Sequence, residues 1–274
     1  MIGVFDSGLG GLSVLAAIAR ALPSTDLTYF ADTAHLPYGN KPDEFIRTRV
    51  QAIGAHLVAC GCTTLVAACN TATAAAVQSL RQAHPEIAVV GIEPGIKPAA
   101  LSSQTRRIAV LATESTARSA RLKQLIETHA STVAVHVEPC PGWATRVETL
   151  HRDDPAFARE IADKILPLLD DGADRIVLGC THYAFLADRL NPLIAGRAEL
   201  VEVAEAVARE VVRRVSSAFQ EGEKESGKIH LLASANPERL HAALPALGLE
   251  NLLSRINDPA QLVNLMPDHR APNR

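Results

Sequence analysis

Short apolar runs recur along the chain and alternate with longer segments of helical periodicity. The runs expected to form strands are residues 2–5, 27–31, 64–68, 87–91, 107–112, 133–137, 175–179 and 229–233. The apolar positions that share one helical face are Ile46, Val50, Ile53 and Leu57 in one segment, and Ile161, Ile165 and Leu168 or Leu169 in another. Apolar runs separated by helices are typical of parallel strands covered on both faces. The pattern therefore predicts an α/β fold with mainly parallel sheets flanked by helices.

One apolar stretch is long enough to suggest a membrane span, because no Asp, Glu, Lys or Arg lies between Arg49 and Arg81. Polar residues such as Asn70 and Thr71 interrupt it, and its periodicity changes from helix to strand and back. The stretch therefore predicts a buried helix, strand and helix, and no membrane segment is expected.

The chain contains an internal repeat. LVAACNTA at residues 65–72 aligns with IVLGCTHY at 176–183, and IGVFDSG at 2–8 aligns more loosely with IAVLATE at 108–114. The two offsets, 111 and 106 residues, nearly agree, which indicates two related α/β halves. We expect a first domain of residues 1–97 plus 205–274 and a second domain of residues 98–204.

Composition narrows the class of protein. The 274 residues are 47% hydrophobic and 21% charged, with a formal net charge of −3, as in globular proteins that bind small molecules. The absence of a basic run argues against a nucleic-acid partner. The N-terminal sequence does not resemble a secretion signal, so the expected location is cytoplasmic, where the five cysteines would stay reduced. Cys60 and Cys62 have no second pair at ligand spacing, so no metal site is expected.

Cys69 and Cys180 occupy matching places in the repeat. Each follows an apolar run and precedes two polar residues, so each is expected at the carboxyl end of a strand, where parallel sheets bind ligands. Cys69 is also expected near a helix N-terminus, which favours a thiolate. A single thiol of this kind is more often a packing residue, but two equivalent thiols favour a catalytic pair.

The glycine-rich segment FDSGLGGLS, residues 5–13, lies at a predicted strand-to-helix turn. Gly8, Gly10 and Gly11 would let backbone amides approach an anion there. The spacing matches neither a Walker A loop nor a dinucleotide fingerprint, so we expect the segment to bind an amino-acid carboxylate. Asp6 ends the same strand and is a candidate to position a thiol or to bind a substrate ammonium, with helix capping as the alternative.

Two further features add candidate residues. His182 lies two residues after Cys180, where an imidazole can polarise a thiol or stabilise a thiolate. Tyr38 and Gly39 belong to the segment HLPYGNK, residues 35–41, whose proline and glycine are typical of a turn and consistent with a binding loop.

Taken together, FDSGLGGLS, PYG, AACNTA and LGCTHY, in this order and spacing, resemble the motifs of glutamate racemases within the aspartate/glutamate racemase superfamily. The resemblance covers most of the chain. It implies two pseudosymmetric domains that enclose the substrate at their interface, and interconversion of L- and D-glutamate without a cofactor. It also implies a supply of D-glutamate for peptidoglycan synthesis and hence for cell-wall biogenesis and cell shape, and it leaves a homodimer open.

The resemblance also assigns roles to residues. It implies Cys69 and Cys180 as the catalytic pair, assisted by Asp6, His182 and Glu148, although Glu148 by its local sequence would be taken for a surface acid. The residues implied to contact substrate are Asp6, Ser7, Tyr38, Gly39, Asn70, Thr71, Thr181 and His182.

Two thiols suit the chemistry of inverting an amino acid at Cα. One group must remove the proton from one face while another delivers a proton to the opposite face. None of the six lysines lies in a recognisable Schiff-base context, so no pyridoxal cofactor is expected. The alternatives left open are a racemase of the same superfamily that acts on aspartate or hydantoin, and a noncatalytic binding protein.

Overall fold

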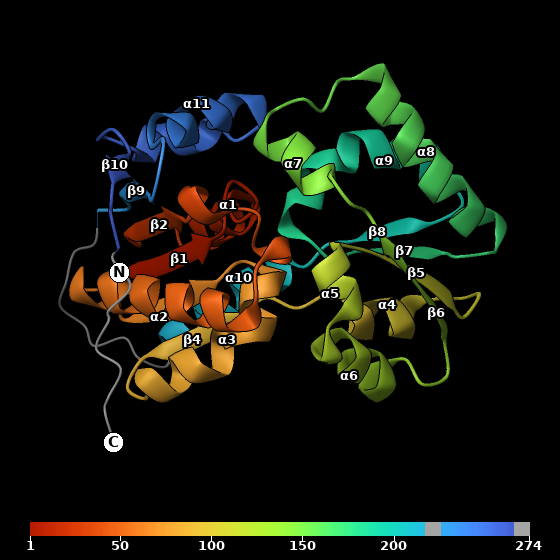
Figure 1. The fold of residues 1–274 in the computed structure, drawn as a ribbon, viewed down its shortest axis with the longest axis horizontal. Helices are drawn as coiled ribbons and strands as arrows, with labels where there is room; N and C mark the ends of the chain where they lie inside the picture. The colour runs from red at the N-terminus through yellow and green to blue at the C-terminus, as the bar shows by residue number, and fades with distance from the viewer. Residues whose placement is uncertain (217–225, 266–274) are drawn as a thin grey trace.

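The computed structural model describes residues 1–216 and 226–265, which form two α/β halves (Figure 1). The N-terminal elements are β1 (Ile2–Asp6), α1 (Leu12–Ala21), β2 (Leu27–Ala31), η1 (Thr33–His35), η2 (Tyr38–Asn40), α2 (Asp43–Ala59), β3 (Thr64–Ala67), α3 (Asn70–Ala83), β4 (Ala88–Gly91) and α4 (Ile96–Ser102). Those that follow are β5 (Arg107–Ala112), α5 (Glu114–Arg118), α6 (Ala120–His129), β6 (Ala134–Pro139), α7 (Trp143–Glu148), α8 (Pro155–Asp170), β7 (Arg175–Leu178), η3 (Thr181–Leu186), α9 (Ala187–Ile194) and β8 (Glu199–Val201). The last are α10 (Ala204–Ser216), β9 (Ile229–Ala233), α11 (Glu238–Ala246), η4 (Glu250–Arg255) and β10 (Gln261–Leu262).

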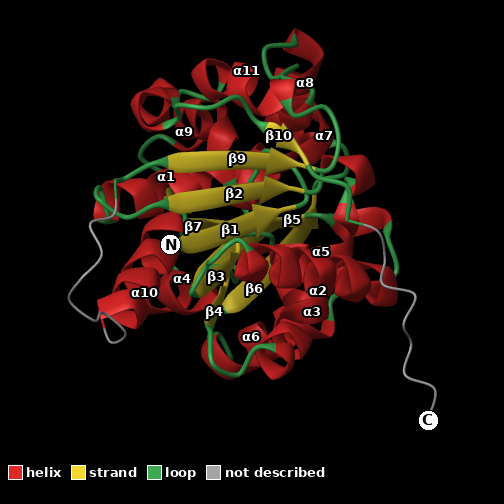
Figure 2. Cartoon of the chain, turned by 90° about the vertical axis from the view of Figure 1, so that its left-hand side faces the viewer, coloured by secondary structure: helices red, strands yellow, loops and turns green. Residues whose placement is uncertain are grey.

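Two parallel sheets organise these elements. One has the strand order β10-β9-β2-β1-β3-β4 and the other the order β6-β5-β7-β8, and every described strand pair is parallel. Helices lie on both sides of the first sheet (Figure 2). The expected α/β class with mainly parallel sheets is confirmed.

The internal repeat is visible in the strand register. The order β2-β1-β3-β4 of the first sheet recurs as β6-β5-β7-β8 in the second. Phe5 of β1 pairs with Ala67 of β3, and Leu111 of β5 pairs with Leu178 of β7. These pairs are separated by the same 106 and 111 residues that the sequence alignment gave, so the two halves repeat one supersecondary unit.

The C-terminal stretch returns to the first half. Strand β9 pairs with β2 and β10 pairs with β9, and α10 packs against α1. In Figure 1 the blue C-terminal elements accordingly lie beside the red and orange N-terminal ones. The division into residues 1–97 plus 205–274 and 98–204 remains a prediction, part of which falls on residues 217–225 and 266–274, outside the described chain.

The predicted elements agree closely with the observed ones. All eight predicted strands are present, with ends shifted by at most two residues. The stretch between Arg49 and Arg81 forms the end of α2, then β3 and α3, and its apolar residues Val50, Ile53 and Leu57 on α2 are fully buried. In the described part of the chain no helix is long and apolar enough to cross a membrane.

Candidate active site

Both repeated cysteines lie just beyond the carboxyl ends of central strands. Cys69 is the N-cap of α3, two residues after β3, and Cys180 is the N-cap of η3, two residues after β7. Their exposed fractions are 7% and 8%. Both line one small cavity of about 30 Å³, enough for roughly two water molecules. The remaining candidates that line it are Ser7, Tyr38, Gly39, Asn70, Thr71, Thr181 and His182.

The surroundings of Cys69 favour its protonated form. Its sulfur accepts a hydrogen bond from the N–H of Ala72 (3.5 Å), in the first turn of α3, and lies 4.0 Å from the hydroxyl of Ser7. Burial raises the pKa of the Cys69 thiol well above its usual range, and the nearby carboxylate of Asp6 raises it further. The expected helix N-terminus is present, but burial and the acid outweigh its effect, so Cys69 rests as a thiol.

Cys180 has a basic neighbour instead. Its sulfur lies 3.5 Å from Nδ1 of His182, and Nε2 of the same ring contacts Oε1 of Glu148 at 2.5 Å. Burial alone would lower the pKa of His182, but Cys180 and Glu148 outweigh burial and hold this pKa well above its usual value. A protonated His182 can donate to both the Cys180 sulfur and the Glu148 carboxylate.

Asp6 is fully buried and joins the two halves. Its carboxylate accepts hydrogen bonds from the N–H of Gly8 (2.8 Å), the hydroxyl of Ser7 (3.2 Å) and the hydroxyl of Thr181 (3.0 Å) in the opposite half. Burial raises the pKa of Asp6 to about 6, although His182 and the Gly8 amide oppose this rise. Asp6 is therefore mostly ionised near neutral pH.

The glycine-rich loop binds carboxylates of the protein itself, and the expectation that it binds a substrate anion stays a prediction. Its Gly8 amide donates to Asp6, and its Leu9 amide donates to Oε1 of Glu148 (2.6 Å) across the interface. A Cβ added at Gly8 would lie 2.0 Å from Oε1 of Glu148, and one at Gly10 would lie 2.5 Å from Nδ1 of His182. The loop needs glycine because the side chains of Glu148 and His182 from the other half press against its backbone.

Asn70 is the strongest candidate for binding a ligand by its side chain. It is 6% exposed, and neither its Oδ1 nor its Nδ2 has a hydrogen-bond partner within the protein. Leaving such a group buried and unpaired is costly. Since Asn70 lines the cavity beside Cys69, its amide can both donate to and accept from a bound molecule.

The structure separates the candidates into two groups. Asp6 and Glu148 do not line the cavity and reach it through Thr181 and His182. The hydroxyl proton of Thr181 is engaged by Asp6, which leaves the Thr181 oxygen as an acceptor for a ligand.

Two cavity residues with hydroxyl side chains were absent from the sequence candidates, namely Thr113 and Thr116, whose hydroxyls lie 3.0 Å apart. The repeat could have indicated the first, because the offset of 106 residues aligns Thr113 with Ser7. Thr116 carries no signal in the sequence.

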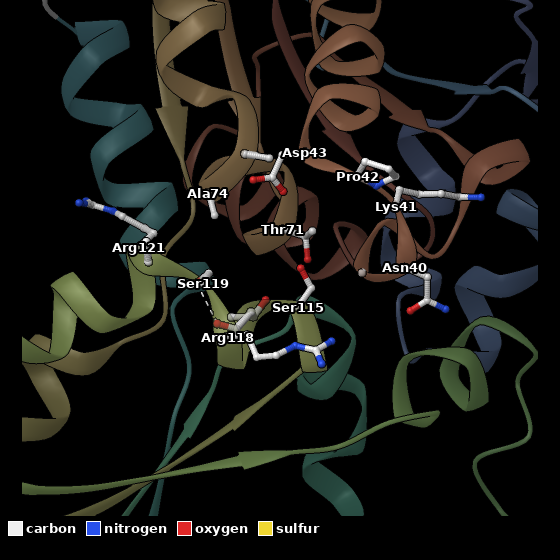
Figure 3. A pocket seen from close by; sticks show the side chains of 14 residues that line it. Asn40, Lys41, Pro42, Asp43, Thr71, Ala74, Ser115, Arg118, Ser119 and Arg121 are labelled. Atoms are coloured by element: carbon white, nitrogen blue, oxygen red, sulfur yellow. Dashed lines mark hydrogen bonds between the residues drawn. The ribbon is translucent and has the colours of Figure 1, made fainter.

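A wider cleft adjoins the cavity between the two halves. It measures about 620 Å³ and shares Gly39, Thr71 and Thr116 with the catalytic cavity. In Figure 3 the side chains of Thr71 and Ser115 approach one another from opposite sides of this cleft, and the guanidinium of Arg118 lies beneath them. The cleft therefore borders the cavity that both thiols line.

The other three cysteines lie outside this site. Cys62 and Cys140 are buried, whereas Cys60 is exposed. Within residues 1–216 and 226–265, no group of three or more His, Cys, Asp and Glu side chains is arranged to hold a metal ion.

Comparisons with known proteins identify the family and the fold. The model of the family described as Asp/Glu/Hydantoin racemase matches residues 2–211. A glutamate racemase from Pseudomonas aeruginosa is 42% identical over 246 residues, which cover 90% of this chain and 93% of that protein. Among solved structures, Escherichia coli glutamate racemase in complex with L-glutamate and the activator UDP-MurNAc-Ala superposes with a TM-score of 0.84 at 27% identity, covering 97% of this chain and 98% of that one. Glutamate racemase isoform RacE1 from Bacillus anthracis gives the same TM-score at 29% identity and covers 97% of each chain.

Proposed function

The chain belongs to the Asp/Glu/hydantoin racemase family, and we propose that it interconverts L- and D-glutamate by proton transfer through Cys69 and Cys180. The single observation that carries this proposal is the pair of thiols at equivalent strand ends of two repeated halves, both lining one cavity. Related enzymes named glutamate racemases support glutamate as the substrate.

The two thiols have different neighbours, His182 for Cys180 and Asp6 for Cys69, which suits opposite roles. With Cys180 as thiolate beside protonated His182, its sulfur takes the Cα proton from one face of the substrate and becomes a thiol. Cys69, held as a thiol, gives its proton to the opposite face of the carbanion and becomes a thiolate. The roles reverse for the other enantiomer, and exchange of protons with solvent restores the resting pair.

The carbanion is stabilised by polar groups around the cavity. Asn70 offers a free amide and the hydroxyl of Thr71 lines the same space, whereas the hydroxyl protons of Ser7 and Thr181 are engaged by Asp6. Donors fixed in a site that excludes water act strongly on charge as it develops at the substrate carboxylate. From behind the cavity, Asp6 adds to the effect of burial in raising the pKa of Cys69, and Glu148 helps to raise the pKa of His182 beside Cys180.

Substrate entry requires the halves to move. The cavity of about 30 Å³ is far too small for an amino acid, whereas the adjoining cleft measures about 620 Å³. We propose that glutamate enters through this cleft and that η2 and α5 separate to admit it. Closure afterwards would exclude water from the carbanion.

The proposal requires no metal or organic cofactor, because the residues described supply both the base and the acid. The product D-glutamate would serve peptidoglycan synthesis. Aspartate and hydantoin remain alternative substrates, distinguished by experiment.

Protection of the thiols tests substrate and site together. Alkylation of the protein with iodoacetamide, followed by mass spectrometry of each cysteine peptide, should show slower labelling of Cys69 and Cys180 in the presence of glutamate. Labelling of exposed Cys60 should stay unchanged, which provides an internal control. Equal labelling of all peptides with and without glutamate would contradict binding at this cavity.

A further inference from the structure

A buried ion pair lies beside the catalytic cavity and has no part in the proton transfers described above. Asp32 follows β2 and is fully buried, and Arg49 of α2 is 3% exposed. Nε and Nη2 of Arg49 donate to the two oxygens of the Asp32 carboxylate at 3.0 and 2.8 Å. Burying two charges is expensive even when they pair well, so a buried ion pair is weak evidence for a stabilising role alone.

The carboxylate of Asp32 has a further side-chain partner, Tyr38. The phenol of Tyr38 donates to Oδ2 of Asp32 at 2.6 Å. Tyr38 is 1% exposed and lines the catalytic cavity, as does its neighbour Gly39. Because its proton is engaged by Asp32, the phenol is fixed in one orientation, and the wall of the cavity formed by Tyr38 is fixed with it.

Two backbone contacts connect the pair to the rest of the site. The N–H of Asp32 donates to the carbonyl oxygen of Asp6 (2.9 Å), at the end of the neighbouring strand. Nη1 of Arg49 donates to the carbonyl oxygen of Leu265 (2.7 Å), in the segment after β10. The Asp32–Arg49 pair therefore connects the C-terminal segment at Leu265 with the end of β1 at Asp6.

We propose that Asp32 and Arg49 are positioning residues that hold Tyr38 and the adjoining Gly39 in the geometry that receives the substrate. The inference rests on the proposed racemisation for its kinetic test, but the geometry it describes exists without substrate. Ordering the wall beforehand removes part of the entropy cost of binding.

A double-mutant cycle tests the link between Asp32 and Tyr38. Tyr38→Phe removes only the hydroxyl, and it should raise KM for glutamate about tenfold while kcat changes less than about threefold, as expected for loss of one hydrogen bond to a charged group. Asp32→Asn should raise KM at least as much. In the double variant KM should equal that of Asp32→Asn within about twofold. If KM in the double variant rose by the product of the two single increases, the proposal would be overturned, because Asp32 would then act independently of Tyr38.

Asp174→Asn is the matched control. Asp174 is a buried acid in the other half, 3.7 Å from Arg175, and it accepts hydrogen bonds from Ser103, Gln104 and Thr105. This variant should lower the unfolding temperature and leave KM unchanged. An equal rise in KM in Asp174→Asn would mean that any loss of a buried acid disturbs the site, which would also overturn the proposal.

A second readout is independent of the reaction. Release of the Tyr38 wall should expose the cavity, so the rate at which iodoacetamide labels Cys69 should rise about equally in Tyr38→Phe and Asp32→Asn, and not in Asp174→Asn. If the wild type fails to racemise glutamate, the proposed function fails, and the labelling rates still decide the positioning role. Unchanged labelling of Cys69 in Tyr38→Phe would overturn that role even if racemisation is confirmed.

Discussion

Oε1 of Glu148 accepts a hydrogen bond from the backbone N–H of Leu9 at 2.6 Å and contacts Nε2 of His182 at 2.5 Å. Leu9 belongs to the glycine-rich loop of the first half, whereas Glu148 and His182 belong to the second. Glu148, which contacts the His182 imidazole beside Cys180, is therefore held by a backbone N–H of the half that carries Cys69. We therefore propose that closure of the halves and activation of Cys180 are coupled through this oxygen.

Substitution of Gly8 tests this coupling. In Gly8→Ala the added Cβ would lie 2.0 Å from Oε1 of Glu148, so either the loop or the carboxylate must move. We expect kcat/KM to fall about a hundredfold or more, because small displacements of catalytic groups are costly. Gly196→Ala is the control: it strains a glycine at φ +71 but meets no atom within 4 Å, so it should reduce stability without reducing kcat/KM.

The two thiols should be individually essential. Cys69→Ser or Cys180→Ser replaces a thiol by a much weaker acid, so racemisation in either direction should fall by about a thousandfold or more. Polarimetry or chiral chromatography of the reaction measures this loss. Cys60→Ser, which alters an exposed thiol outside the site, should retain full activity. Full activity in either of the first two variants would rule out the two-thiol mechanism.

Glu148→Gln tests whether the charge of Glu148, and not only the size of its side chain, is needed. The amide keeps the size of the side chain but removes the charge that helps to raise the pKa of His182. We expect this pKa, followed by NMR of the imidazole, to fall, and kcat/KM near neutral pH to fall about a hundredfold because less Cys180 is ionised. An unchanged titration of His182 would show that Glu148 does not set the charge of the imidazole.

Asp6 should make stability depend on pH. Its pKa is about 6 in the folded protein against an ordinary value of 3.8, so between these values the folded state binds more protons than the unfolded state. The free energy of unfolding therefore falls as pH rises through this window, and the contribution is about 2 kcal/mol between pH 4 and pH 7. In urea unfolding, the free energy of unfolding of Asp6→Asn should rise relative to that of the wild type by about 2 kcal/mol from pH 4 to pH 7. A difference that stays constant with pH would contradict a raised pKa.

The sequence predicted those features that depend on local pattern. The apolar runs located eight strands, and the offsets of 106 and 111 residues anticipated the register of β1 with β3 and of β5 with β7. Strands β8 and β10 were missed because they are only three and two residues long and depend on pairing with a neighbour, which a hydrophobic pattern does not record.

The electrostatic connections of the site depend on contacts between distant segments. Glu148 resembles a surface acid in its own sequence, and it is buried only because the loop from Gly8 to Gly10 closes over it. Asp32 and Arg49 carry no motif, and their pairing appears only once β2 and α2 are packed together. The loop was expected to bind a substrate anion, which stays a prediction; two of its amides, those of Gly8 and Leu9, donate to Asp6 and Glu148.

The most direct test of the account is incubation of the protein with L-glutamate, and separately with L-aspartate, in deuterated water without added cofactor. We predict D-glutamate that carries deuterium at Cα, and little reaction with aspartate. Reaction with aspartate alone would retain the thiol mechanism but change the substrate. Absence of both inversion and deuterium exchange with either amino acid would contradict racemisation through Cys69 and Cys180.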